Sequence, residues 1–216
     1  MIFIGMKYLL SLLLLISFTV SAQDTVTITH KAYKTTFSKS KRYPVKVEWW
    51  LTRASILCDV RIKRGDKFIP DPKLEEHTKL QSYYAGSGFD RGHNFPSADA
   101  ACDQTANNES FYFSNMTAQY PALNRGDWKE LEEMTRYDVR RYDSTYVWCG
   151  SVGEIKKIGK VSVPKQCWKV IYIKETNTYT AYLFDNTTTK ADGLKNNEVD
   201  LKVIEQISGF KFKINK

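Results

Sequence analysis

Four consecutive residues, Asp90 to His93, place a carboxylate, a guanidinium and an imidazole next to one another in the sequence. A neutral imidazole can accept a proton near pH 7, and a guanidinium can bind an anionic oxygen through two parallel hydrogen bonds. We therefore interpret His93 as a general base and Arg91 as an anion-binding group, while Asp90 is expected to fix the turn. The alternative is that His93 is a structural or surface histidine.

A second pair of polar residues, Asn124 and Glu132, follows about thirty residues later. Eight residues of continuous helix would separate the two by roughly 12 Å, which is too far for both to bind one ion directly. Either Asn124 lies in a loop before the helix, or Glu132 acts through metal-bound water, which suits Mg²⁺ because this ion gives up water reluctantly. The plain alternatives are a capping amide for Asn124 and a solvated helix face for Glu132.

The segments around these residues indicate a strand, a turn and a helix. Residues 107–115 read as a strand, with an apolar face formed by Phe111, Phe113 and Met116. Four residues then recur at helical spacing, namely Trp128, Leu131, Thr135 and Val139, and we expect Trp128 and Leu131 to be core. Asp127 stands near the expected helix start, where a carboxylate offsets the helix dipole.

The rest of the chain is rich in strand patterns. Alternating or apolar runs predict strands at 26–28, 45–52, 146–150, 167–173 and 179–184, the first two being joined through a basic turn at 39–44. Residues 199–207 predict a short amphipathic helix that Gly209 ends. We therefore expect an α+β fold in which helices flank a central antiparallel sheet.

The N-terminus has the pattern of an export signal. Lys7 precedes an apolar run at 8–20, and Val20-Ser21-Ala22 supplies the small residues that a signal peptidase accepts. We expect a signal peptide at 1–22 and one domain at 23–216, so that the protein is exported and either secreted or periplasmic. An uncleaved anchor is the alternative. No later run is apolar enough to cross a bilayer, so no membrane span is expected after cleavage.

The charge favours an anionic partner. The chain has 32 Lys+Arg against 24 Asp+Glu, a formal net charge of +8, and loss of Lys7 with the signal peptide would leave +7. Such a balance attracts polyphosphate chains, although a lysine-rich surface can also serve solubility alone.

Four cysteines are an even number in a chain expected to be exported, which favours two disulfides. We expect Cys149–Cys167, because both lie in strand-like runs close in sequence, and Cys58–Cys102 by elimination. A zinc site is the rival interpretation, but no Cys-x-x-Cys or His-x-x-x-His spacing supports it.

Taken together, the motifs resemble one known family. The segments that carry the resemblance are 90–93 (DRGH), 113–119 (FSNMTAQ), 123–126 (LNRG), and Trp128 with Leu131-Glu132. They resemble the DNA/RNA non-specific endonuclease family, whose best-known members are secreted bacterial nucleases, and the likeness extends from about His30 to Phe210. The resemblance implies a single domain with a ββα-metal (His-Me finger) motif at the active site.

The resemblance also implies roles for individual residues. Asn124 matches the metal-binding asparagine, Glu132 the glutamate that holds the water shell of the ion, and Asn115 a further active-site asparagine. Arg64 is the nearest counterpart of an arginine that precedes an Asp-Pro pair, although the local spacing leaves Arg61 possible. The expected catalytic residues are thus His93, Arg91, Glu132 and Asn115, and the expected substrate-binding residues are Arg64, Arg91 and Arg125.

These observations lead to one expected function. We expect an endonuclease that hydrolyses DNA, RNA or both without sugar or sequence specificity, and that depends on Mg²⁺ or another divalent cation such as Mn²⁺. Two alternatives belong to other classes: a basic module that binds nucleic acid without cutting it, and a hydrolase of small phosphodiesters.

Overall fold

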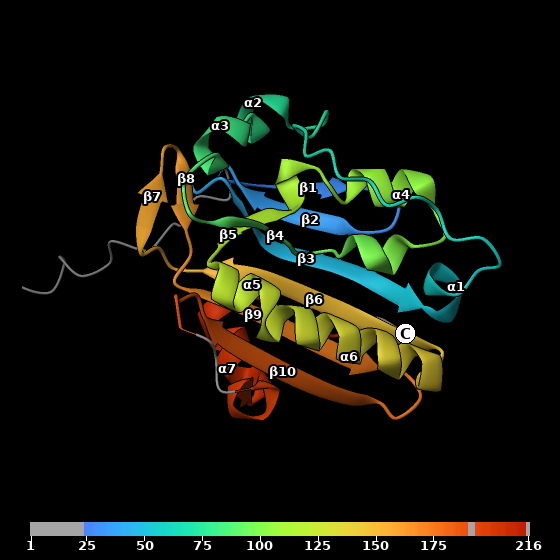
Figure 1. Ribbon diagram of the computed structural model, residues 1–216. Helices are drawn as coiled ribbons and strands as arrows, with labels where there is room; N and C mark the ends of the chain where they lie inside the picture. The colour runs from blue at the N-terminus through green and yellow to red at the C-terminus, as the bar shows by residue number, and fades with distance from the viewer. Residues whose placement is uncertain (1–23, 190–192, 215–216) are drawn as a thin grey trace, which may run out of the picture.

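A seven-stranded antiparallel sheet is the centre of the computed structural model, which describes residues 24–189 and 193–214 (Figure 1). The strands lie in the order β1-β2-β3-β6-β9-β10-β11, and each neighbouring pair is antiparallel. Their bounds are β1 (Thr25–Thr29), β2 (Lys34–Ser38), β3 (Tyr43–Thr52), β6 (Ser144–Val152), β9 (Gln166–Ile173), β10 (Thr178–Asp185) and β11 (Glu198–Val199). The α+β class with a central antiparallel sheet is therefore confirmed.

Both faces of the sheet are covered by helices. The expected helix is α6 (Asp127–Tyr142), which crosses β6 and β9 in Figure 1, and all four residues that recur at helical spacing are buried. The expected C-terminal helix is α7 (Leu201–Ser208), whose Ile204 packs with Trp148 and Trp168 on the opposite face. Gly209 ends α7 in the left-handed conformation, with φ of 73°.

Residues 90–93 belong to a small unit beside the sheet. Strand β4 (Asp90–His93) pairs with β5 (Met116–Gln119), and α5 (Pro121–Arg125) and α6 follow. Gly92 is required in β4, because a Cβ atom there would lie 2.1 Å from Oε1 of Gln119. Gly126, with φ of −100° and ψ of −119°, separates α5 from α6. Strand, strand and helix thus follow in the order that a ββα motif requires.

The other elements are short. They are α1 (Arg53–Ile56), α2 (Glu75–Thr78), α3 (Gln81–Tyr84), η1 (Ser97–Ala100), α4 (Gln104–Glu109), η2 (Phe113–Asn115), β7 (Lys156–Ile158), β8 (Val161–Val163) and η3 (Leu194–Asn197). The segment from Ser97 to Glu109 lies above the sheet on the same side as α6 (Figure 1). No helix among the described residues is long and apolar enough to span a membrane, and the expected signal peptide lies outside that part of the chain.

Two expectations about the strands need correction. Residues 107–115 do not form a strand: Asp103 caps α4 through a hydrogen bond from the Ala106 amide, and η2 follows before β5 begins at Met116. Because side chains in this stretch bind backbone groups, the chain turns instead of extending. In addition, the sequence interpretation missed β2, so the basic turn at 39–44 joins β2 to β3 and not β1 to β3.

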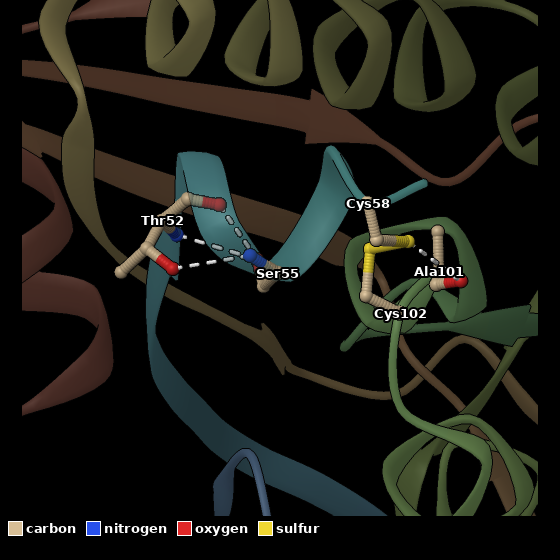
Figure 2. The surroundings of a disulfide bond; sticks show 5 residues. All are labelled: Thr52, Ser55, Cys58, Ala101 and Cys102. Carbon is tan, nitrogen blue, oxygen red and sulfur yellow. Dashed lines mark hydrogen bonds between the residues drawn. A yellow bond between two sulfur atoms is a disulfide. The ribbon is translucent and has the colours of Figure 1, made fainter. Parts of the chain in front are cut away.

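The cysteines form one disulfide and two thiols. Cys58 and Cys102 are bonded, with Cα atoms 5.9 Å apart (Figure 2). The expected Cys149–Cys167 bond is wrong, since both residues are buried free cysteines. They lie on neighbouring strands, but Cys149 faces Lys169 in the register and Cys167 faces Ser151. Such diagonal neighbours are about 7–8 Å apart, whereas a disulfide needs Cβ atoms about 3.5–4.5 Å apart.

Candidate active site

Two cavities meet at the catalytic motif. The larger has a volume of about 590 Å³ and lies between α6, the segment Ser97–Asn107 and the chain around Arg61 to Arg64. The smaller, of about 400 Å³, lies beside Phe68 and the start of β4. Three residues line both cavities, namely Arg64, His93 and Asn124. The general-base candidate and the metal-ligand candidate are therefore at the junction of one open groove.

His93 is held at the end of β4 between aromatic rings. Its ring lies edge-on to Phe111 and Phe68, with centroids 4.9 and 5.6 Å away, and its carbonyl oxygen accepts a hydrogen bond from Nε1 of Trp128 at 3.0 Å. Among the described residues, nothing hydrogen-bonds to its buried Nε2 atom. Burial, assisted by the charges of Arg64 and Arg91, lowers the pKa of His93 to about 3. The ring is thus neutral at pH 7 and has a nitrogen that can take a proton.

Asp90 ties α5 to β4. One carboxylate oxygen accepts a hydrogen bond from Nδ2 of Asn124 at 2.9 Å and another from Nε of Arg125 at 2.8 Å. The second oxygen accepts from Nη2 of Arg125 at 2.7 Å. Burial alone would raise the pKa of Asp90, but the bonds from Arg125 and Asn124 outweigh it and lower the pKa. The expected structural role of Asp90 fits this geometry, and Arg125 is paired with Asp90 in this structure.

The same contact orients Asn124. Since its Nδ2 atom points to Asp90, its Oδ1 atom is left as the acceptor, and no donor to that oxygen exists within the described residues. An amide oxygen with no internal partner can serve as a ligand for a hard cation. The local geometry therefore fits a metal-binding role for Asn124.

Two guanidinium groups flank the histidine, each stacked on a ring. Arg64 donates from Nε to Oγ of Ser97 at 3.0 Å, and its guanidinium lies 5.4 Å from the centroid of Phe111. Arg91 lies 4.3 Å from the centroid of Phe68 in the smaller cavity. Arg61 lines the larger cavity but not the smaller one. Arg64 is thus the better placed of the two alternatives for contact beside His93.

Glu132 faces the larger cavity from α6, while Asn124 reaches it from α5. The expected loop position of Asn124 is wrong, because Asn124 lies in α5, which Gly126 separates from the helix of Glu132. The alternative in which Glu132 acts through metal-bound water stays a prediction. Burial raises the pKa of Glu132 to about 7, although the charges of Lys169 and Arg136 act in the opposite direction.

Asn115 does not line either cavity. Its side chain is fully buried, accepts from the Phe95 amide at 2.8 Å, and donates to the carbonyl oxygens of Phe95 and Ser110 at 2.9 and 2.8 Å. The amide therefore fixes the chain just after His93, and the geometry favours this supporting role over contact with a substrate.

The sequence interpretation missed three charged residues near the larger cavity, of which Asp99 and Lys169 are buried and Arg136 lines the cavity. Asp99 accepts hydrogen bonds from Nη1 of Arg136 at 2.9 Å and from Nε1 of Trp49 at 3.1 Å. Lys169 is 1% exposed, and its Nζ atom lies 4.2 Å from the centroid of the Trp128 ring. Arg136 could have been found, because it follows Glu132 by four residues and so shares its helix face. Asp99 and Lys169 carry no such signal.

Few protein ligands are available for a metal. Across the described ranges, no group of three or more His, Cys, Asp or Glu side chains could hold an ion. Oxygen donors that line the larger cavity include the amide of Asn124 and the carboxylates of Glu132 and Glu133. Such a set suits a hard cation that keeps most of its water, as Mg²⁺ does.

Comparison with known proteins agrees with this geometry. A nuclease from Nostoc sp. is 32% identical over 157 residues, which cover 71% of this chain and 56% of the relative. Nuclease 1, mitochondrial, from Schizosaccharomyces pombe is 32% identical over 209 residues, which cover 85% of this chain and 64% of the relative. The chain thus spans just over half of the Nostoc nuclease and just under two thirds of the Schizosaccharomyces pombe nuclease.

A solved structure shares the fold, and a family model matches the sequence. A crystal structure of an EndoG/EndoGI complex superposes with a TM-score of 0.78 at 24% identity, covering 86% of this chain and 84% of that one. The model of the DNA/RNA non-specific endonuclease family matches residues 13–216, which is nearly the whole sequence. The chain therefore belongs to the DNA/RNA non-specific endonuclease family.

Proposed function

We propose that the protein is a metal-dependent endonuclease that hydrolyses DNA, RNA or both without sugar or sequence specificity. Membership of the family supports this proposal, as do relatives that are named nucleases. The observation that carries it is the junction of the two cavities, which a neutral histidine lines together with Asn124 and Arg64.

His93 acts as the general base. Its imidazole ring takes a proton from water as the water oxygen bonds to phosphorus, and the bond from phosphorus to the 3′ oxygen breaks, so that the 3′ oxygen leaves as an alkoxide that takes a proton from solvent. Arg91 and Arg64 bind non-bridging phosphate oxygens from the two sides of His93, which neutralises charge and aligns the phosphate. Stacking on Phe68 and Phe111 limits the motion of both guanidinium groups.

Asn124 would hold the divalent cation through Oδ1, and Glu132 would accept hydrogen bonds from its water. Mg²⁺ is the favoured ion, with Mn²⁺ as a substitute. When bound, such an ion supplies charge stabilisation for the phosphate and the leaving oxygen. Asp90 serves this ligand indirectly, because it fixes which end of the Asn124 amide faces the cavity.

Backbone recognition explains the proposed lack of specificity. The candidate contacts are guanidinium groups, which bind phosphates, and phosphates carry no direct sequence information. We further propose that residues 1–22 direct export, that one domain follows at 23–216, and that the enzyme acts on nucleic acid in the periplasm or outside the cell.

The substitution His93→Ala tests the function. Purified protein is incubated with supercoiled plasmid and with RNA, each with Mg²⁺ and with a chelator. Wild type should cut the plasmid, the RNA or both in Mg²⁺ and neither in the chelator. The rate of cleavage by His93→Ala should be at least about 100-fold lower, because a general base usually contributes that factor. Circular dichroism and binding in the chelator should remain close to wild type.

Two results would contradict the proposal. Wild type that binds the plasmid but leaves it supercoiled at every metal concentration would indicate a binding module. Turnover of a small phosphodiester with long DNA and RNA left intact would indicate a different hydrolase. Near-full activity of His93→Ala would remove this residue from the mechanism.

A further inference from the structure

Residues Leu57 to Phe68, here called the arginine segment, run from the end of α1 to the cavity junction without helix or strand. None of these residues is buried, so the segment has little apolar anchoring. It nevertheless carries Arg61 and Arg64, both of which line the larger cavity. Part of the positive charge of the site thus depends on a weakly packed stretch of chain.

Polar contacts hold the arginine segment to one wall of the cavity. The Ile62 amide donates to the carbonyl oxygen of Ala101 at 3.1 Å, and the Gly65 amide donates to Oδ1 of Asn107 at 2.8 Å. The bond from Arg64 to Ser97 is a third contact of this kind, and the partners in all three contacts belong to the segment Ser97–Asn107. Each such bond contributes little net free energy at a partly exposed position, because water competes for it.

The disulfide joins the same two parts of the chain. Cys58 lies three residues before Arg61, and Cys102 directly follows Ala101, at a sequence separation of 44 (Figure 2). Beside it is a cavity of about 380 Å³, lined by Ile56, Leu57, Cys58, Asp59, Arg61 and Arg140. The segment is therefore not packed against a solid core at this end, and a covalent bond holds it there.

We infer that the Cys58–Cys102 disulfide positions Arg61 and Arg64 over the larger cavity for binding to phosphates of the substrate, both at the scissile bond and next to it. The inference rests on the proposed function and adds a redox requirement to substrate binding. A dithiol reductant breaks the Cys58–Cys102 bond: the dithiol loses two electrons and two protons to become a cyclic disulfide, and the two cysteines become thiols. Cys58 is exposed and Cys102 is half-buried, so a small dithiol can reach the bond.

The test compares wild type with the double variant Cys58→Ser/Cys102→Ser. Binding to long duplex DNA is measured in a chelator, so that no cleavage occurs, over a range of salt concentrations. The Kd of the variant should rise on the order of threefold to tenfold, and the slope of log Kd against log salt should decrease by about 0.9 for each phosphate that the protein no longer neutralises.

A combined variant separates positioning from general loss of structure. In an Arg61→Ala/Arg64→Ala background, removing the disulfide should leave Kd unchanged, since coupled groups give non-additive effects. Dithiothreitol should weaken binding by wild type and have no effect on the double cysteine variant. Circular dichroism of wild type in dithiothreitol checks that the fold is kept while binding is measured, and reduced protein that unfolds would contradict a role limited to positioning.

Three results would overturn the inference: an unchanged Kd and salt slope without the disulfide, a fully additive effect in the arginine-free background, or no response of wild type to the dithiol. Failure of the proposed function is separate, because oxidised wild type would then not cut plasmid in Mg²⁺ whatever the binding experiment gives.

Discussion

The substitution Asp90→Ala removes the carboxylate that orients Asn124 and leaves the imidazole of His93 in place. In Asp90→Ala, the Nδ2 atom of Asn124 loses a charge-assisted hydrogen bond of 2.9 Å, and its amide becomes free to turn. Hydrogen bonds to charged groups contribute about 1.5–3 kcal/mol. Loss of a group that orients a ligand typically lowers metal affinity or activity about 10- to 100-fold. We therefore expect the Mg²⁺ concentration for half-maximal cleavage to rise by that factor.

The assay is plasmid cleavage over a series of Mg²⁺ concentrations, with much of the lost rate regained at high Mg²⁺. Arg125→Ala is the matched control, because it removes the other partner of Asp90 and leaves the bond to Asn124 in place. Its side chain is 71% exposed, so we expect less than about a threefold change in the Mg²⁺ requirement. Equal Mg²⁺ requirements in Asp90→Ala and Arg125→Ala would refute the role assigned to Asp90.

Two further predictions concern stability. Gly92→Ala should lower the free energy of unfolding by about 1–3 kcal/mol, because the new Cβ atom meets the buried side chain of Gln119; an unchanged urea midpoint would show that the strand adjusts freely. Burial tends to raise the pKa of Asp71, but nearby His30 and a hydrogen bond from Ser114 outweigh it and lower the pKa. The stabilisation is therefore present above about pH 4 and is lost as the pH falls, so urea unfolding from about pH 6 to 3 should show a steeper loss for wild type than for Asp71→Asn.

The local motifs made much of the site predictable. His93 and Arg91 are close in sequence, and the helical spacing after Trp128 placed Glu132 on a helix, so their neighbourhood followed from short-range patterns. The break at Gly126 could not be predicted with the same certainty, because the residues on both sides favour helix. The break lies at Gly126, whose backbone is not helical, and a hydrogen bond to Asp90 holds Asn124 near the end of α5.

Long-range features were harder to predict. The spacing of Cys149 and Cys167 suggested neighbouring strands, which is correct, but a register offset of two residues prevents the bond, and register depends on tertiary packing. Lys169 has the pattern of an ordinary charged position in a strand, since lysine is rarely buried. The direction in which the Asn115 amide points is likewise set by the folded chain around Phe95 and Ser110.

Some charges near the groove are enclosed by the protein. They belong to Asp99 and Lys169, which are buried, and to Arg136, whose side chain is 14% exposed. Mobile ions reduce the attraction between exposed charges, but they act much less on charges that the protein encloses. Added salt should thus slow the capture of nucleic acid at the exposed arginines, while the field that a bound phosphate experiences from these enclosed charges stays nearly constant. We therefore expect salt to lower the rate of substrate capture more than it changes the electrostatic interactions of substrate that is already bound.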